Sequence, residues 1–190
     1  MKKRILIASM LTIGFVSTAS AQVTVVGGGA AKDCYHSVKH GDPGRIGTIK
    51  SCEGALEEYS LGLKDRAATH VNIGILYMRR KDYDKSEEHY AKALKMGGGI
   101  AEVHINLAAN FIYTGRYDEA VTSANKAIEI GTTKMPEVLF NRAMAYDHLE
   151  RYNEAYNDLK KALELRPDWP PALNAIDNYE VVPAPKPSNG

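Results

Sequence analysis

The residues of this chain that are best suited to chemistry are two cysteines and two histidines close together in the sequence. Cys34 and Cys52 could form a disulfide, a redox-active pair or part of a metal site, although their spacing is not that of a CxxC motif. His36 and His40 are four residues apart and would share one face of a helix, so they could bind a metal together with a neighbouring cysteine or Asp42. The segment lacks the glutamate of an HExxH arrangement. This favours a solvated helix face over a metal site.

The rest of the sequence contains no pattern that indicates a reaction. The glycine-rich stretch VVGGGAAK lacks the lysine and serine or threonine that end a phosphate-binding loop. We find no nucleophile elbow and no pair of carboxylates in a recognisable cleft. His70 and His104 lie 34 residues apart, which a repeated architecture explains better than catalysis does. We therefore expect a protein that is not an enzyme and that has no cofactor and no metal.

The N-terminal sequence MKKRILIASMLTIGFVSTASAQ has the organisation of a secretory signal peptide. A basic start, Lys2 to Arg4, precedes an apolar run of about twelve residues and a small-residue cleavage site at Ala19–Ala21. We expect cleavage after Ala21 and a periplasmic or secreted mature protein. The alternative, an uncleaved anchor, is disfavoured because a spanning helix needs about twenty apolar residues. We expect no stable membrane insertion after cleavage.

The charge of the chain is nearly balanced. The formal net charge is +1, and removal of the three basic residues of the signal peptide would change it to −2. Nucleic acids and anionic membrane surfaces attract strongly basic proteins. The composition therefore argues against a nucleic-acid or membrane-surface partner.

The elements that must position these residues follow a repeat. A segment of 23 residues occurs three times, at intervals of 34 and 35 residues. The copies are NIGILYMRRKDYDKSEEHYAKAL (72–94), NLAANFIYTGRYDEAVTSANKAI (106–128) and NRAMAYDHLERYNEAYNDLKKAL (141–163). A period near 34 residues is typical of stacked helical hairpins.

Each copy has a small residue, a ring three positions later, a tyrosine at the turn, and two further small residues. These positions are Gly74, Ala108 and Ala143; Tyr77, Phe111 and Tyr146; Tyr83, Tyr117 and Tyr152; Ser86, Ala120 and Ala155; and Ala93, Ala127 and Ala162. Helices approach closely where small residues meet, and rings fill the adjoining space. The residues after the turn tyrosines are Asp84, Asp118 and Asn153, which we expect to cap the second helices, with Asp84 and Glu87 as a capping box.

This pattern resembles the tetratricopeptide repeat (TPR) family and suggests an exported bacterial member of it. The resemblance implies an all-α fold, a right-handed α-α superhelix of antiparallel helix pairs that ends in a capping helix. The expected units are the signal peptide 1–21, a flexible lead-in 22–32, a degenerate hairpin 33–66, the array 67–180 (repeats 67–100, 101–134 and 136–169, then the capping helix 170–180), and a disordered proline-rich tail 181–190.

The resemblance also bears on the cysteines. The stretch TIKSCEGALEE resembles the second helix of a TPR hairpin, and HGDPG would form the preceding turn. Cys34 and Cys52 would then lie roughly opposite each other on antiparallel helices. Export to an oxidising compartment permits a disulfide between them, which would stabilise this weakly packed end of the array. A redox-active or metal-binding pair remains the alternative.

In TPR proteins the first helix of each pair lines a concave groove, and partners are proteins or peptides. The matching positions here form the candidate partner-binding site: Asn72, Ile75, Arg79, Ile105, Asn106, Ile112, Tyr113, Phe140, Asn141, Met144 and His148. The asparagine in each repeat could serve local packing, or the three could form a ladder that pairs with the backbone of an extended ligand. With Glu102, Glu137 and Asp147 also on this face, we expect acidic terminal peptides to bind poorly.

The leading interpretation is a periplasmic or secreted scaffold that holds a peptide or a helix in the groove. Two alternatives are a subunit that binds through its convex face or self-associates, and an accessory factor of a cell-envelope enzyme complex. The sequence does not specify the partner, the pathway or the oligomeric state.

Overall fold

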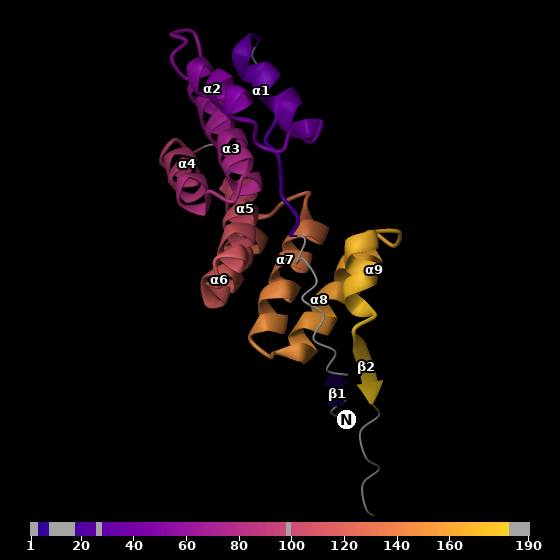
Figure 1. Ribbon diagram of the computed structural model, residues 1–190. Helices are drawn as coiled ribbons and strands as arrows, with labels where there is room; N and C mark the ends of the chain where they lie inside the picture. The colour runs from indigo at the N-terminus through magenta and orange to yellow at the C-terminus, as the bar shows by residue number, and fades with distance from the viewer. Residues whose placement is uncertain (1–3, 8–17, 26–27, 98–99, 183–190) are drawn as a thin grey trace, which may run out of the picture.

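The computed structural model describes residues 4–7, 18–25, 28–97 and 100–182. Within these ranges it contains nine helices and two short strands (Figure 1). The helices are α1 Ala30–Lys39, α2 Ile46–Ala55, α3 Leu63–Arg79, α4 Tyr83–Lys95, α5 Ile100–Tyr113, α6 Tyr117–Ile130, α7 Met135–His148, α8 Tyr152–Leu165 and α9 Pro170–Ile176. Strands β1 (Arg4–Ile7) and β2 (Tyr179–Val182) pair antiparallel, with Arg4 opposite Val182. The predicted all-α solenoid is confirmed.

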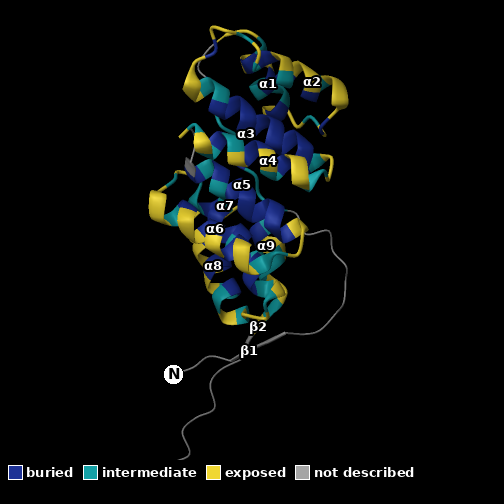
Figure 2. Cartoon of the chain, turned by 90° about the vertical axis from the view of Figure 1, so that its left-hand side faces the viewer, coloured by how far each residue is buried: buried dark blue, intermediate teal, exposed yellow. Residues whose placement is uncertain are grey.

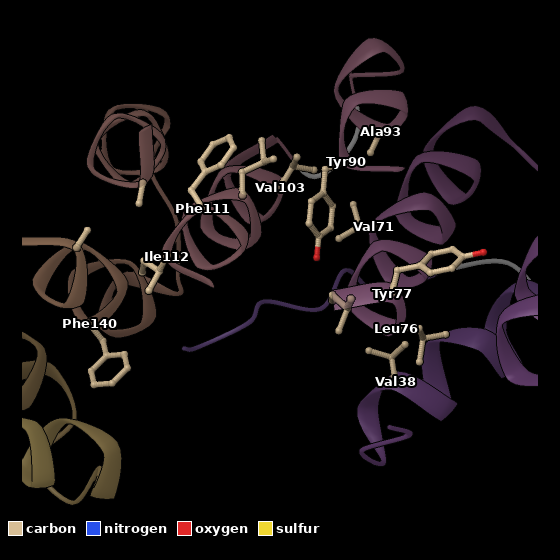
Figure 3. Close-up of a cluster of buried hydrophobic side chains, with 14 of the residues drawn as sticks. Val38, Val71, Leu76, Tyr77, Tyr90, Ala93, Val103, Phe111, Ile112 and Phe140 are labelled. Atoms are coloured by element: carbon tan, nitrogen blue, oxygen red, sulfur yellow. The ribbon is translucent and has the colours of Figure 1, made fainter. Parts of the chain in front are cut away.

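Each predicted repeat is one hairpin: α3 with α4, α5 with α6, and α7 with α8. The helices stack in chain order, and the buried residues are concentrated along α3, α5 and α7 (Figure 2). Figure 3 shows part of the resulting core, in which Val71 and Tyr90 of the first hairpin face Val103 of α5. None of the helices in the described ranges is long and apolar enough to cross a membrane.

The three hairpins share one turn geometry. Two positions after the last residue of the first helix comes a residue with a left-handed backbone: Lys81 (φ 65°), Gly115 (φ 75°) or Glu150 (φ 58°). The next backbone N–H reaches back five residues, as Arg116 does to the carbonyl of Phe111 at 2.8 Å. This is the hydrogen bond of a Schellman motif, which satisfies a carbonyl at the helix end.

The second helices begin two residues earlier than expected, at the turn tyrosines themselves. Their N-cap positions are Asp82, Arg116 and Arg151. Only Asp82 accepts a capping hydrogen bond, from the backbone N–H of Lys85 at 3.4 Å. The expected caps at Asp84, Asp118 and Asn153 are therefore wrong, because these residues already lie inside the first turn.

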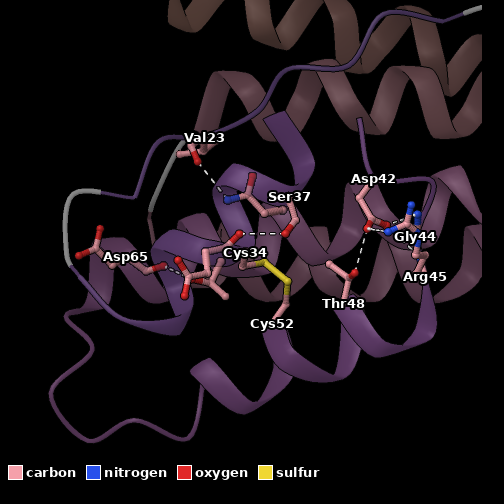
Figure 4. The surroundings of a disulfide bond; sticks show 12 residues. Val23, Cys34, Ser37, Asp42, Gly44, Arg45, Thr48, Cys52 and Asp65 are labelled. Atoms are coloured by element: carbon pink, nitrogen blue, oxygen red, sulfur yellow. Dashed lines mark hydrogen bonds and ion pairs between the residues drawn. A yellow bond between two sulfur atoms is a disulfide. The ribbon is translucent and has the colours of Figure 1, made fainter. Parts of the chain in front are cut away.

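The degenerate hairpin consists of α1 and α2, and Cys34 is bonded to Cys52 across it (Figure 4). The two Cα atoms are 5.1 Å apart, and both cysteines are buried in the main core cluster. Asp42 organises the turn, because its carboxylate accepts hydrogen bonds from the backbone N–H groups of Gly44 and Arg45 and from the Thr48 hydroxyl. This hairpin packs on α3 and so extends the array at its N-terminal end.

The C-terminal end differs from the expectation of one helix over 170–180. Helix α9 ends at Ile176, and Tyr179 starts the strand that pairs with β1. The Tyr179 hydroxyl donates to Asp147 Oδ1 at 2.5 Å, which ties this segment to α7. The expected disordered tail begins at 181, but residues 181–182 belong to β2; residues 183–190 lie outside the described residues.

Candidate functional site: a groove lined by asparagines

Helices α3, α5 and α7 each carry one asparagine at the same register position, namely Asn72, Asn106 and Asn141. All three side chains are fully buried, with 0 % of their surface exposed. A buried amide requires hydrogen-bond partners for both its oxygen and its nitrogen. The partners of these amides come from a distant part of the chain.

Residues 18–25 form an extended segment that runs along these helices (Figure 1). The backbone N–H of Ala21 donates to Asn106 Oδ1, and Asn106 Nδ2 donates to the carbonyl of Ala21, both at 2.8 Å. Asn141 bonds the N–H and carbonyl of Ala19 in the same way, at 2.9 and 2.8 Å. Each of these two amides thus satisfies both backbone groups of one residue.

The third asparagine makes only half of this arrangement. Asn72 Nδ2 donates to the carbonyl of Val23 at 3.1 Å (Figure 4). Its Oδ1 atom is buried and finds no hydrogen-bond partner among the residues that the structure describes. The ladder therefore advances two residues of the segment per repeat and is weaker at its α3 end.

The other predicted site residues are distributed unevenly. Four of them, Ile75, Ile105, Ile112 and Phe140, are buried, with at most 4 % of their surface exposed. Tyr113 remains 40 % exposed, and its hydroxyl accepts a hydrogen bond from the N–H of Thr18 at 3.3 Å. These positions therefore contribute packing, and the polar contacts come from the asparagines and Tyr113.

Two positions near the C-terminal end of the groove are partly accessible. Met144 is half-buried and packs against the main core cluster. His148 is exposed and stacks on Tyr117, with ring centroids 4.4 Å apart. Neither residue forms a polar contact with residues 18–25 among the hydrogen bonds of the described ranges.

The expected role of Arg79 as a groove cation requires correction. Its Nη1 atom donates to the carbonyls of Val38 and Asp42, at 3.1 and 2.8 Å. The guanidinium lies at the end of α3, where it donates to one carbonyl near the end of α1 and to one in the turn that follows α1. Arg79 therefore joins the degenerate hairpin to the array.

Two of the acidic residues on this face also interact with side chains nearer the C-terminus. Glu137 Oε1 is 2.9 Å from Arg166 Nη2, and Asp147 accepts the hydroxyl of Tyr179. Their charges are thus directed toward the C-terminal elements. No group of three or more potential metal ligands occurs in the described ranges. His36 in α1 is half-buried, and His40, directly after α1, is exposed.

A buried histidine pair that the sequence did not indicate lies between α3 and α4. His70 Nδ1 and His89 Nδ1 are 3.0 Å apart, so one ring donates to the other. The side chains are only 7 % and 8 % exposed. Burial lowers the pKa of each to about 4, and the neighbouring Lys92 acts in the same direction.

This pair predicts a loss of stability in mild acid. The pKa of each ring is lower in the folded than in the unfolded protein, so the unfolded chain takes up protons first. The contribution to stability is complete above about pH 6.5 and is lost as the pH falls toward 4. We expect a loss of about 2 kcal/mol, less than two independent shifts would give because a singly protonated pair keeps its hydrogen bond. Urea unfolding at a series of pH values measures it.

A His89→Gln variant is the control, because its side chain can accept the same hydrogen bond but does not titrate. Its stability should vary less between pH 7 and 4.5 than that of the native chain. Identical pH profiles for the two proteins would contradict the assignment to this pair.

With the geometry described, the chain can be compared with known proteins. Profiles of the tetratricopeptide repeat match residues 65–133 and 136–168. A segment of 69 residues is 32 % identical to the Hsp70-Hsp90 organizing protein of Triticum aestivum, covering 36 % of this chain but only 11 % of that protein.

Solved structures agree with this match. The Arabidopsis OM64 TPR domain is 28 % identical, with a TM-score of 0.57 over 61 % of this chain and 95 % of that domain. The second TPR domain of human RPAP3, solved with the HSP70 peptide SGPTIEEVD, is 22 % identical, with a TM-score of 0.55 over 61 % of this chain and 96 % of that domain. The repeat profiles together cover more than half of the chain, and the hairpins coincide with them, so this protein belongs to the tetratricopeptide repeat family.

Proposed function

We propose that this protein is an exported interaction module that holds an extended segment of a partner protein in the groove lined by Asn72, Asn106 and Asn141. The observation that carries this proposal is the pairing of Asn106 and Asn141 with both backbone groups of Ala21 and Ala19. Hydrogen bonds to the backbone are available from any sequence. The groove therefore suits a partner segment in extended form better than a helix, whose backbone groups are bonded internally.

Export would itself open this groove. The expected cleavage after Ala21 falls within the bound segment and would remove residues 18–21. Asn106 would then lose both of its partners, and Asn141 would keep only the hydrogen bond from Nδ2 to the carbonyl of Ile105, at 3.2 Å. Val23 could remain at Asn72. Vacated amides in an apolar groove are costly to leave unpaired, and this favours their use by an incoming backbone.

Mass spectrometry of the protein purified from a bacterial periplasm tests the export proposal. We expect a mature chain that begins at Gln22, with no free thiol. Recovery of the intact N-terminus from the cytosol alone would contradict export and cleavage.

Peptide binding tests the groove. Changing Asn106 and Asn141 together to alanine should weaken binding of the labelled peptide TASAQVTV, the sequence of residues 18–25, by at least about tenfold, since each lost hydrogen bond costs about 0.5–1.5 kcal/mol. Fluorescence polarisation with the exported form measures this effect, and circular dichroism checks the helix content. Asn157→Ala, on the exposed face of α8, is the matched control.

Unchanged affinity in the double variant would contradict the asparagine ladder and favour binding through the convex face.

The acidic peptide SGPTIEEVD provides a comparison of ligand class. We expect it to bind less tightly than TASAQVTV, because Arg79, the only strong cation among the expected groove positions, is bonded to the carbonyls of Val38 and Asp42. Tighter binding of the acidic peptide would contradict this expectation.

A further inference from the structure

The bound segment shows which side chains the groove accepts. In extended backbone, successive side chains point to opposite sides. Four alternate residues of the segment pack against the buried clusters of the array. Of the residues between them, Thr24 is exposed, and Ser20 and Gln22 are half-buried without belonging to these clusters. The four packed residues are Ala19, Ala21, Val23 and Val25.

The space at the centre of the groove is small. Ala21 is only 2 % exposed and belongs to a buried cluster with Ile105, Ala108 and Val138. These neighbours are themselves buried, with no exposed surface. A larger side chain at this position would have to displace close-packed helices, which native interiors resist.

The segment also has a fixed direction. Its residues 19, 21 and 23 pair with α7, α5 and α3 respectively, so the bound chain runs from the third repeat to the first. The two valines of the segment lie toward the α3 end. Val23 is half-buried beside Asn72, and Val25 is 4 % exposed in a cluster with Ala31, Leu61 and Ala68.

From these contacts we infer that the groove selects its ligand by side-chain size at alternate positions. The inference rests on the proposed function. The partner segment has alanine, or a residue as small, at the position that meets Asn106, and a valine-sized residue two positions later, beside Asn72. It lies with its N-terminal end at α7. The intervening residues alternate to the other side of the extended backbone, where only Thr24 is fully exposed, and we expect little selection there.

The full chain contains its own probe for this selection, because residues 18–25 occupy the groove. In the full chain with its signal sequence retained and its disulfide formed, Ala21→Leu should accelerate hydrogen exchange of the Ala19 and Ala21 amides by at least about tenfold, because leucine does not fit the cluster. Gln22→Leu adds the same side chain on the outward side. It should change these exchange rates by less than about threefold.

A second measurement tests the same selection with a separate ligand. The Ala21→Leu chain, whose own segment is displaced, should bind the labelled peptide TASAQVTV and its outward variant TASALVTV with similar affinity. The inward variant TASLQVTV should bind at least about tenfold less tightly. Circular dichroism of the Ala21→Leu chain confirms that the array is folded.

The outcomes separate this inference from the proposed function. Equal affinity for all three peptides, or equal exchange rates in the two leucine variants, would overturn the size selection while leaving the groove as a binding site. Unprotected Ala19 and Ala21 amides in the native chain, together with no binding of any peptide, would overturn the proposed function as well.

Discussion

Replacing Gly74 with alanine is expected to lower the free energy of unfolding by about 2–3 kcal/mol. Gly74 is in the middle of α3, where alanine is normally the better helix former by about 1 kcal/mol. Here a Cβ atom would lie 2.4 Å from Cε1 and 2.8 Å from Cδ1 of Tyr90. The Tyr90 ring has no exposed surface, so it cannot turn aside without displacing its neighbours. The steric cost therefore exceeds the gain in helix propensity.

Thermal or urea unfolding measures this effect, and the chain offers a matched control. Gly54 in α2 is exposed, and a Cβ atom there would meet nothing within 4 Å. Gly54→Ala should be neutral or stabilising by up to about 1 kcal/mol. Equal changes in the free energy of unfolding for the two substitutions would show that the contact with Tyr90 does not restrict the size of the side chain at position 74.

Reducing the Cys34–Cys52 disulfide is expected to destabilise the α1–α2 hairpin by about 3 kcal/mol, the value that chain entropy gives for a loop of this length. Stability in a repeat array is the sum of local terms, so the loss should be confined to this end. Hydrogen exchange with and without reductant measures it region by region. We expect faster exchange in α1 and α2 and little change in α7 and α8.

A double Cys34→Ala/Cys52→Ala variant distinguishes loss of the bond from effects of the reductant. It should match the reduced protein, apart from a small loss of packing at two buried positions. Uniform loosening of all helices on reduction would contradict the local character of the disulfide. Unchanged exchange throughout would show that Arg79 and the packing on α3 hold the hairpin without it.

The repeats could be predicted from the sequence because their cause is local and recurs. Small residues at fixed spacing, such as Gly74 and Ala108, determine where two helices approach, and a period of 34 residues reports this geometry directly. The disulfide could be predicted from the same hairpin geometry. The expected starts of the second helices were two residues too late, because Asp84 has a suitable capping side chain and Arg116 does not. The Schellman turns, and not side-chain caps, determine where these helices begin.

The occupant of the groove could not be predicted from the same kind of pattern. Ala21 and Asn106 are 85 residues apart, and nothing in either local sequence indicates the other. The sequence ASA already fits the expected signal-peptide cleavage site, so it offers no reason to expect a second role. The hydrogen-bond partners of Arg79 could not be predicted for a similar reason. Its long side chain reaches the carbonyls of Val38 and Asp42, which its position on the helix does not identify.

The matched spacing of asparagines and bound residues has a consequence for the length of ligand that such proteins can hold. Two residues of extended chain span about 6.6 Å, and each hairpin contributes one amide for every two residues. An array with one more asparagine-bearing hairpin would thus engage a segment two residues longer, and one fewer would shorten it by two. The number of ligand residues that the asparagines bind would then depend on the number of repeats. It could change by duplication or loss of whole hairpins without any change inside them.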